Sequence, residues 1–581
     1  MLLLSGILAL ALAIYTLIKW IWIAPFTSPL RKVRMPPGGQ GLLGHQIAIM
    51  SASSVARDIP KWTAALGETF RTQNFFGFYH KLWTIDHAAL HHILRHTETW
   101  EKPPMLRKAL GRYLRSGLIN MEGPRHRLVR KICQPLFSGG NIRGMMPTFL
   151  EKGEQLRQQW SDYIQAHTSS APGGYNTALL IDVLDSFNRL SFDIIGLTAF
   201  DHDFDALADA RYQAVQYNWE TKSASASAGL RTVIKQQEGR GEGGRVYDEY
   251  DETFAPHPGY SGFRGMAHVA FPILDRWVPT EASKHIRRGM ENIEDLTQRL
   301  TRAKRAQFVE REEGTDDAIT TDDKPTLSRD LLSLIVKADM ASDLEQRMTD
   351  DEIAGALATF MFAGTDTGSI MMSWCLFHLA GSPDIQARLR DECLAYGDVI
   401  SMEDLDSLPL LDRVVKEVFR LNPSIPTTIR EAMKDDIIPL AKPIMLASGE
   451  VVSELKIRKG QHVYIPIEGM NWAPSVWGED CLQFNPDRWI DKRIPASSGL
   501  GIDHDVLTFI DGPRKCLGYR MGALEIKCAL FTLVRYFEFA RDPQIQVRHW
   551  NLFTNRPFAL DRRFQSVSNM PIIVRQYKNA V

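Results

Sequence analysis

The chain has 581 residues, of which 44% are hydrophobic and 24% charged, a composition that excludes a disordered polyelectrolyte and predicts a sizeable core. Its 68 basic residues balance 69 acidic ones, and the net charge of −1 argues against a nucleic-acid partner. The six cysteines form no CxxC pair, which argues against a zinc ribbon or a secreted disulfide framework.

The amino-terminal segment, residues 1–24, is strongly apolar and carries its first charge at Lys19. It is long enough for a helix that crosses a membrane. A cleaved signal peptide is the alternative, but that would require a basic region before the apolar run. Because the basic residues follow the run instead, we expect a single-pass anchor with the rest of the chain in the cytosol.

Residues 25–45 combine basic residues with prolines and glycines, which is typical of a hinge between an anchor and a globular body. The body, residues 46–581, is predicted to be mainly α with a small β part. Helices are expected at residues 141–166, 176–199, 283–310, 349–379, 383–396 and 410–421. Strands are expected at residues 70–78, 81–85, 450–455 and 462–465. Two polar segments, about 238–265 and 311–326, are predicted to be surface insertions.

A cysteine loop near the carboxyl end carries the strongest chemical signal. In the run Phe509-Ile510-Asp511-Gly512-Pro513-Arg514-Lys515-Cys516-Leu517-Gly518, the glycines allow a tight turn around one sulfur, and Arg514 and Lys515 favour its thiolate form. The helical pattern of residues 520–534 points its amino-terminal dipole back at the sulfur. Taken alone, the loop leaves open both an iron-binding thiolate and a buried structural cysteine.

A second candidate site lies inside the helix that begins with the capping box Thr349-x-x-Glu352. The run Ala363-Gly364-Thr365-Asp366-Thr367 places Gly and Thr in mid-helix, where Gly costs up to about 1 kcal/mol relative to Ala. Gly364 would let a flat ligand or dioxygen approach the backbone. A Thr hydroxyl that bonds back along the helix would open a notch there. An ordinary kink is the alternative.

These motifs closely resemble those of the cytochrome P-450 family and follow the same order. All five fixed positions of its haem-binding signature, Phe-x-x-Gly-x-Arg-x-Cys-x-Gly, are matched. The resemblance implies that Cys516 is the axial thiolate ligand of the iron of haem b and that Arg514 pairs with a haem propionate. The implied fold is that of the family, preceded by the N-terminal transmembrane helix.

The run at residues 363–367 resembles the family's oxygen-activation motif. By that resemblance Thr367 donates a hydrogen bond to the dioxygen and Asp366 relays protons. The chain departs from the pattern at Gly368, where many members carry Thr or Ser.

Several charged residues also match family motifs. Glu417 and Arg420 correspond to the Glu-x-x-Arg helix, and Arg488 belongs to a Pro-x-Arg-Phe element in which Trp489 replaces Phe. The implied role of these three charged residues is a buried structural network behind the haem. His126 and Arg130 stand in the place of the family's Trp-x-x-x-Arg helix. The implied cofactor-binding set is Cys516, Arg514, His126, Arg130, Arg430, Phe509 and Gly364.

The implied function is insertion of one oxygen atom into a lipophilic small molecule, by hydroxylation or epoxidation. The general pattern is similar to fungal microsomal members, which favours a terpenoid or other secondary metabolite as substrate. No flavin or nicotinamide domain is visible, so the resemblance and the anchor imply electrons from NADPH through a separate NADPH–haemoprotein reductase at the endoplasmic reticulum membrane.

Two alternatives remain. A hydroperoxide-rearranging haem-thiolate enzyme would need neither reductase nor dioxygen, and the presence of Asp366 and Thr367 argues against it. A non-catalytic haem-binding sensor would bind haem without oxidising NADPH through a reductase.

Overall fold

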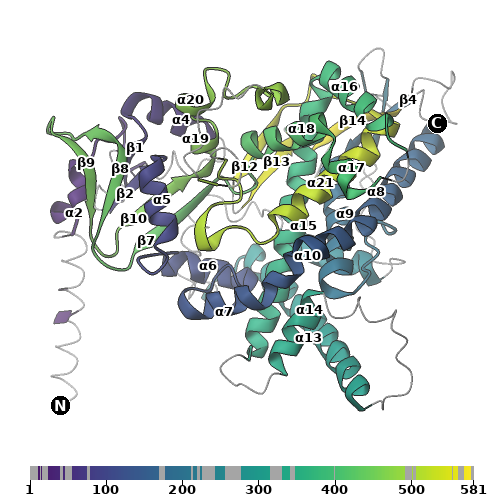
Figure 1. The fold of residues 1–581 in the computed structure, drawn as a ribbon, viewed down its shortest axis with the longest axis horizontal. Helices are drawn as coiled ribbons and strands as arrows, with labels where there is room; N and C mark the ends of the chain where they lie inside the picture. Colours follow the sequence, from purple (N-terminus) through teal and green to yellow (C-terminus); the bar gives the residue numbers. More distant parts are fainter. Residues whose placement is uncertain are drawn as a thin grey trace. The chain divides into compact units, whose positions relative to one another are not determined.

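The structure is a computed structural model, drawn in Figure 1. It describes residues 11–12, 15, 24–39, 44–45, 55–74, 79–168, 177–210, 214–218, 223–224, 242–254, 277–313, 330–340, 347–397, 400–490, 500–501, 506–551, 554–559 and 568–577. The chain divides into two compact units. Unit 1 comprises Met1–Pro103, Ile425–Gln483 and Asp491–Cys516, and unit 2 comprises Pro104–Ser424, Phe484–Ile490 and Leu517–Val581.

Unit 1 is built on a five-stranded sheet in the order β1-β2-β10-β7-β3, in which β10 pairs parallel to β2 and the other pairs are antiparallel. Its strands are β1 Thr69–Asn74, β2 Tyr79–Thr84, β3 Trp100–Glu101, β7 Thr427–Ala432 and β10 His462–Pro466, with a separate hairpin of β8 Asp436–Met445 and β9 Val451–Ile457. The helices are α2 Ala24–Thr27, η2 Pro29–Lys32, α4 Val55–Leu66, α5 His87–Arg95, α19 Ile467–Asn471, α20 Pro474–Trp477 and η6 Gly512–Arg514. A buried apolar cluster, which includes Leu90 and Val463, joins α5 to the sheet.

The predicted hinge is partly built into unit 1. Leu30 and Val33 are buried. Arg71 on β1 donates its backbone N–H to the carbonyl of Arg34 at 2.9 Å and its Nε–H to the carbonyl of Val33 at 2.8 Å. These contacts fix residues 30–34 to the sheet, so this part of the segment is not a free linker.

Unit 2 is mainly helical. Its helices are α6 Pro104–Leu114, α7 Gly123–Cys133, η3 Gln134–Phe137, α8 Gly139–Thr168, α9 Val183–Phe200, α10 Glu242–Phe254, α13 Glu281–Glu313, α14 Leu331–Asp339, α15 Asp350–Ala380, α16 Pro383–Leu394, α17 Met402–Asp406, α18 Pro409–Leu421, η5 Pro486–Trp489 and α21 Tyr519–Tyr536. Its strands are β4 Thr177–Asp182, β5 Ala214–Asn218, β6 Ser223–Ala224, β11 Phe537–Ala540, β12 Val547–Asn551, β13 Asn555–Ala559 and β14 Pro571–Gln576. The sheet order is β11-β14-β4-β5-β6, and β12 and β13 form a hairpin.

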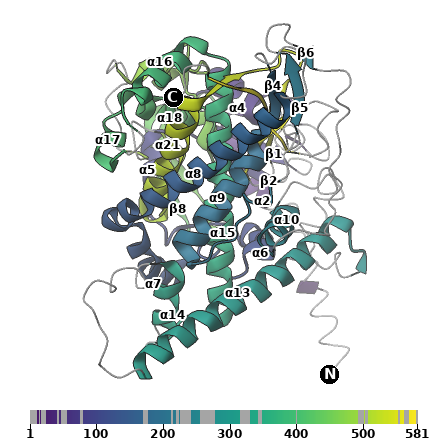
Figure 2. The ribbon, with the colours of Figure 1, turned by 90° about the vertical axis from the view of Figure 1, so that its right-hand side faces the viewer.

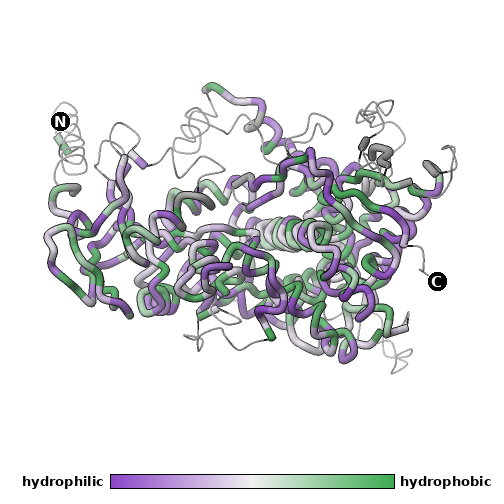
Figure 3. The backbone as a smooth tube through the Cα atoms, turned by 90° about the horizontal axis from the view of Figure 1, so that it is seen from above, coloured by the Kyte–Doolittle hydropathy of each residue, from purple (hydrophilic) through white to green (hydrophobic). Residues whose placement is uncertain are grey.

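Helix α15 is the core of unit 2 and packs against α9, α13, α18 and α21 (Figure 2). Its predicted capping box is confirmed, because Thr349 and Glu352 each accept a hydrogen bond from the other's backbone N–H. Hydrophobic and hydrophilic residues alternate along the surrounding elements (Figure 3), as expected for helices with one face in a core. The mainly helical class with a small β part is therefore confirmed.

Most predicted elements are found within a few residues of their expected bounds, but two predictions differ from the structure. Residues 177–182 form β4 rather than the start of a helix, because this apolar run is hydrogen-bonded between β14 and β5. Asp182 then caps α9 by accepting from the backbone N–H of Leu184. Within the expected insertion at about 238–265, residues 242–254 form α10, with Tyr247 and Tyr250 buried. Residues 314–326 of the other insertion lie outside the described part of the chain.

The prediction of an N-terminal transmembrane helix is contradicted, and with it the placement of the protein as a single-pass protein of the endoplasmic reticulum membrane. A spanning helix needs about 20 apolar residues. Among the described residues no helix is both long and apolar enough, and the described helix at this end, α2, covers Ala24–Thr27. Most of residues 1–24 lie outside the described part of the chain.

Two histidines in unit 2 are held neutral by their surroundings. His378 stacks on Phe484 and its Nε2 lies 2.7 Å from Asn422 Oδ1, while His549 stacks on Trp374. Burial lowers the pKa of His378 to about 3 and that of His549 to about 4. Below pH 6.5 the two histidines bind protons in the unfolded chain but stay neutral in the folded protein. Their contribution to the free energy of unfolding is therefore lost as the pH falls towards 4.

We therefore predict that His378→Gln, which can keep the hydrogen bond to Asn422, becomes more stable relative to wild type as the pH falls. The gain between pH 7.5 and pH 5 should be about 1–2 kcal/mol, measured as the free energy of unfolding in urea. The control is His91→Gln on the exposed face of α5, which should follow wild type at both pH values. A constant difference between His378→Gln and wild type would contradict the prediction.

Candidate active site

Cys516 is the exposed cysteine of the chain, and the other five are buried. Burial raises the pKa of the Cys133 and Cys393 thiols to about 12 and raises those of Cys375 and Cys528 as well. Because the thiolate is the metal ligand, these four thiols are unsuited to that role. Cys481 is buried as well, at 5% exposure, so Cys516 is the candidate ligand as the cysteine that an incoming metal centre could reach.

The loop before Cys516 is fixed by its own backbone. The Cys516 N–H donates to the carbonyl of Phe509 at 3.0 Å and the Lys515 N–H donates to the carbonyl of Gly512 at 3.0 Å. Gly512 has a φ of +71°, and a Cβ there would lie 2.6 Å from the carbonyl oxygen of Leu94 on α5. A side chain at this position would displace α5 or open the turn, which explains why the turn needs glycine.

A buried asparagine that the sequence did not reveal anchors the same loop. Asn471, at the end of α19, accepts a hydrogen bond from the Leu507 N–H at 2.8 Å and donates one to Thr508 Oγ1 at 2.9 Å. On the other side, Asp511 pairs with Arg95 of α5. Phe509 and Arg514 are half-buried between these anchors.

Arg430 on β7 of unit 1 is a buried cation suited to an anionic ligand. Its guanidinium donates to Thr428 Oγ1 at 2.9 Å and to the carbonyl of Ile429 at 2.8 Å, and no carboxylate of the described residues pairs with it. Burial lowers its pKa to about 10. A buried charge without a counter-ion is costly. A haem propionate would supply that counter-ion, so the loop cysteine and Arg430 fit this group.

In unit 2, α15 is buried at every residue from Ile353 to Leu376 except Phe362, Ala363, Gly364 and Thr367. The partly exposed surface of this helix thus coincides with the predicted oxygen-activation motif. Thr367 Oγ1 donates to the carbonyl of Ala363 at 2.7 Å, which confirms the expected bond back along the helix. The carbonyl of Thr367 accepts a hydrogen bond from Ser424 Oγ at 3.0 Å.

The glycines of this motif serve helix packing. A Cβ on Gly364 would lie 2.7 Å from Ile195 Cδ1 of α9. A Cβ on Gly368 would lie 3.3 Å from Glu525 Oε2 of α21 and 3.4 Å from Ser191 Oγ of α9. The departure from the family pattern at Gly368 therefore leaves room for a buried carboxyl. That Gly364 also contacts a cofactor stays a prediction.

Asp366, the predicted proton relay, is buried and paired with a residue that the sequence did not indicate. Its Oδ1 is in ion-pair contact with Arg556 Nη2 of β13, and Asp251 Oδ1 of α10 lies 3.7 Å from Arg556 Nη1. Burial alone would lower the pKa of Arg556, but these two carboxylates raise it above its ordinary value. No local spacing connects residue 366 with residue 556, so single-sequence reasoning could not find this pair.

The predicted charged network is present and larger than expected. Arg420 donates to both oxygens of Glu417, each at 2.9 Å, and both side chains are fully buried. Arg488 Nε donates to Glu417 Oε1 at 3.3 Å. Trp489, which replaces the family's Phe, donates its indole N–H to Glu417 Oε2 at 3.1 Å. The network thus joins α18 to η5.

The other predicted site residues of unit 2 lie on α7. His126 is buried and Arg130 is half-buried, one turn further along the same helix. The structure therefore groups the predicted residues in two sets. Phe509, Arg514, Cys516 and Arg430 belong to unit 1, and His126, Arg130, Gly364, Asp366 and Thr367 belong to unit 2.

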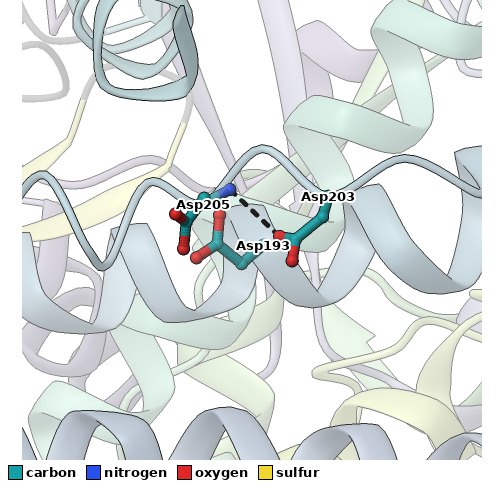
Figure 4. Close-up of side chains that lie close together, drawn as sticks. All are labelled: Asp193, Asp203 and Asp205. Carbon is teal, nitrogen blue, oxygen red and sulfur yellow. Dashed lines mark hydrogen bonds between the residues drawn. The ribbon is translucent and has the colours of Figure 1, made fainter. Parts of the chain in front are cut away.

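A cluster of three aspartates in unit 2 needs no metal to account for it. Asp193, Asp203 and Asp205 each place a carboxylate oxygen within 4.8 Å of the others (Figure 4). Lys152 Nζ lies 3.1 Å from Asp203 Oδ1 and 3.8 Å from Asp193 Oδ2. Asp193 also accepts the backbone N–H of Ala206 at 2.7 Å. The cluster therefore ties α8 and α9 to the following loop.

Comparison with known proteins gives the same family as the resemblance of the sequence motifs. The sequence profile of the family described as Cytochrome P450 matches residues 37–233 and 260–557. The chain belongs to the cytochrome P450 family. It is 32% identical to Cytochrome P450 monooxygenase 128 of Postia placenta, over 99% of this chain and 97% of that protein. Cytochrome P450 monooxygenase 205 of the same fungus is 30% identical, over 98% of this chain and 97% of that protein. Cytochrome P450 monooxygenase claQ of Ampulloclitocybe clavipes is 29% identical, over 82% of this chain and 80% of that protein.

Membership in the cytochrome P450 family makes this protein an oxidoreductase, a monooxygenase whose cofactor is thiolate-ligated haem and whose electrons come from a reductase. The similar proteins are named monooxygenases over nearly the whole chain, which favours catalysis over the haem-binding sensor. Their fungal origin agrees with the predicted resemblance.

We predict that Glu417→Gln destabilises the protein by about 3–5 kcal/mol, because it removes the buried negative charge that Arg420 and Arg488 share. Trp489→Phe, which restores the family's residue, should cost about 1.5–3 kcal/mol for one hydrogen bond to a charged acceptor. Urea unfolding followed by fluorescence measures both. Lys416→Gln on the same helix removes a half-exposed ion pair with Asp412 and should cost less than about 1 kcal/mol. Equal losses for Glu417→Gln and Lys416→Gln would show that the network does not hold the fold.

Proposed function

We propose that Cys516 is the axial ligand of the haem and that Arg430 and Arg514, which belong to the same unit, pair with its propionates. His126 and Arg130 on α7 stay the further propionate partners that the family resemblance predicts. The observation that carries this proposal is the exposed cysteine at the end of a loop whose backbone bonds and glycine fix its position. When bound, the haem supplies activation of dioxygen, and the thiolate favours cleavage of its O–O bond. The protein supplies binding, orientation and protons.

Thr367 and Asp366 are proposed to deliver protons during turnover. Thr367 Oγ1 lies on the partly exposed surface of α15 and has an acceptor at Ala363. Rotation of this hydroxyl away from that carbonyl would let it donate to a bound oxygen ligand. Asp366 is its chain neighbour and the nearest ionisable group in the helix sequence, so it is the proposed acid.

The proposed substrate is a lipophilic small molecule, with a terpenoid or other secondary metabolite as the leading class. The support is the apolar surroundings of the motif: the ring centroid of Phe362 on α15 lies 4.9 Å from that of Phe254 of α10, and Phe254 in turn contacts Tyr113 of α6. Apolar and aromatic side chains of this kind line most small-molecule sites. Expression with a reductase, followed by profiling of products from a panel of terpenoids and aromatic compounds, tests the substrate class. Turnover of only polar compounds would contradict it.

The proposed electron donor is a separate NADPH–haemoprotein reductase. The support is the family, whose membership implies that electrons come from a reductase. NADPH oxidation should therefore require added reductase. Oxidation of NADPH by the purified protein without that partner would contradict the proposal.

We predict that Cys516→Ala removes the spectrum that marks a thiolate-ligated haem in its reduced carbon monoxide complex. The matched controls are single replacements of the buried cysteines, such as Cys481→Ser, which should retain the spectrum once folded. Retention of the spectrum by Cys516→Ala would overturn the ligand assignment.

We predict that Thr367→Ala keeps haem and substrate binding but diverts the electrons of NADPH into hydrogen peroxide, because the lost hydroxyl acts only during turnover. Asp366→Asn should slow the proton-dependent step by about 10²–10⁴-fold. The control is Thr359→Ala, which removes a hydroxyl two turns earlier on α15. If both Thr367→Ala and Asp366→Asn couple NADPH to product as wild type does, the hydroperoxide-rearranging alternative gains support.

A further inference from the structure

Ser424 is a buried serine that contacts α15 from the segment between α18 and β7. It is 5% exposed, and its Oγ lies 3.0 Å from the carbonyl oxygen of Thr367. A carbonyl oxygen carries no proton, so the serine hydroxyl is the donor. The two residues are 57 positions apart in the sequence, so no local pattern indicates this bond. The residue proposed above to deliver a proton is thus held by a side chain from outside its own helix.

The segment that carries Ser424 is itself fixed. Pro423 has a restricted φ and also limits the conformation of Asn422 before it. The carbonyl of Ser424 accepts the backbone N–H of Asn555 at 2.7 Å, and Asn555 Nδ2 donates to the carbonyl of Pro423 at 3.4 Å. Asn422 Oδ1 lies 2.7 Å from Nε2 of His378 in the last turn of α15. These bonds tie the segment to both α15 and β13.

The bond from Ser424 adds to the bonds that α15 makes by itself. In a regular helix the carbonyl of residue 367 accepts the N–H of residue 371, and a carbonyl has a second lone pair for another donor. Ser424 can therefore fix this peptide group without breaking the helix. The peptide group begins at the Cα of Thr367. Because a β-branched side chain has few rotamers, the orientation of this backbone decides where the threonine hydroxyl points.

The hydroxyl of Thr367 has an acceptor inside the helix, the carbonyl of Ala363 at 2.7 Å. To donate to another oxygen, the hydroxyl must turn away from that carbonyl while its Cα stays in place. If the backbone tilted at the same time, the hydroxyl would miss its target, and an error of about 1 Å in such a geometry can cost about 10²-fold in rate. A donor anchored outside the helix opposes that tilt.

We propose that Ser424 is a positioning residue for Thr367, which holds the Thr367 peptide group so that the hydroxyl can leave Ala363 and still point at the oxygen that receives the proton. The proposal rests on the function proposed above for Thr367. Ser424 itself neither gives nor takes a proton, because its hydroxyl keeps the bond to the Thr367 carbonyl throughout. A merely structural Ser424 would change stability and leave the products of dioxygen reduction unchanged.

The first experiment uses the haem-loaded protein with a NADPH–haemoprotein reductase, NADPH and dioxygen, without added substrate. Dioxygen is then reduced to hydrogen peroxide or to water, and the ratio of the two products follows from the consumption of NADPH and dioxygen and the peroxide formed. Ser424→Ala should raise the ratio of peroxide to water by about fivefold, as expected for the loss of one hydrogen bond. Ser424→Thr, which keeps the hydroxyl, should match wild type.

The matched control is Ser373→Ala. It removes another buried hydroxyl at α15, one that donates to the carbonyl of Ser369 at 2.7 Å and does not contact Thr367. The ratio of peroxide to water in this variant should equal that of wild type. An increase equal to that of Ser424→Ala would show that any lost hydroxyl in this core has the same effect, and would overturn the inference.

A combination with Thr367→Ala separates this inference from the proposed function. The double variant Ser424→Ala with Thr367→Ala should give the same product ratio as Thr367→Ala, because Ser424 acts through Thr367. If Thr367→Ala raises the ratio but Ser424→Ala does not, or if the two effects add in the double variant, the inference is overturned and the proposed function stands. If Thr367→Ala behaves as wild type, both are overturned.

A readout without turnover tests the bond itself. Hydrogen exchange followed by mass spectrometry measures the local opening of a helix. Ser424→Ala should speed exchange of the amides at residues 367–371 by about fivefold and leave those at residues 353–360 at the wild-type rate. Ser424→Thr should restore the wild-type rate at both. Equal acceleration along the whole of α15 would mean that the hydroxyl contributes to global stability alone. That result, or no acceleration at residues 367–371, would overturn the inference.

Discussion

The burial of α15 is the constraint on which unit 2 depends. A helix enclosed along most of 31 residues keeps most of its polar side chains from water, and several of them have partners within the unit. Thr367 bonds back to Ala363, Ser369 donates to Asn188 of α9, and Asp366 contacts Arg556. The polar residues that we propose for the chemistry, Thr367 and Asp366, therefore also have contacts that hold them within the fold.

Two of the departures from the family pattern, Gly368 and Trp489, are each matched by a polar group. Gly368 leaves space at the contact of α15 with α9 and α21, and that space is taken by the carboxyl of Glu525, which accepts a hydrogen bond from Ser191 Oγ at 2.5 Å. Burial raises the pKa of Glu525 to about 7. Trp489 adds a donor to Glu417 that phenylalanine could not provide. In both cases one substitution is matched by a polar group elsewhere in the chain.

The sequence predicts what depends on local spacing. The capping box at Thr349, the bond from Thr367 to Ala363 and the Glu417–Arg420 pair all lie within four residues, and all three are found. Arg556, Asp251 and Asn471 act on residues that are distant in the chain, so no periodicity reveals them. A short apolar run, such as Ala178–Ile181, fits a buried strand as well as a helix, and tertiary pairing decides between them.

A similar limit applies to the amino terminus, where an apolar run predicted an anchor that the described residues do not show. Hydropathy records the composition of a segment, whereas a membrane span also requires one continuous helix of sufficient length. Residues 30–34, which were expected to be a hinge, instead follow the contacts of Arg71. Here the partner on the sheet determines the local structure.

The distribution of cysteines has a consequence for handling the protein. Five thiols are buried and one is exposed. In an oxidising solution the chain therefore has a single position at which two molecules can be joined covalently through sulfur. A disulfide-linked dimer would use the sulfur that we propose as the iron ligand, so oxidation of the protein without haem would compete with incorporation of haem.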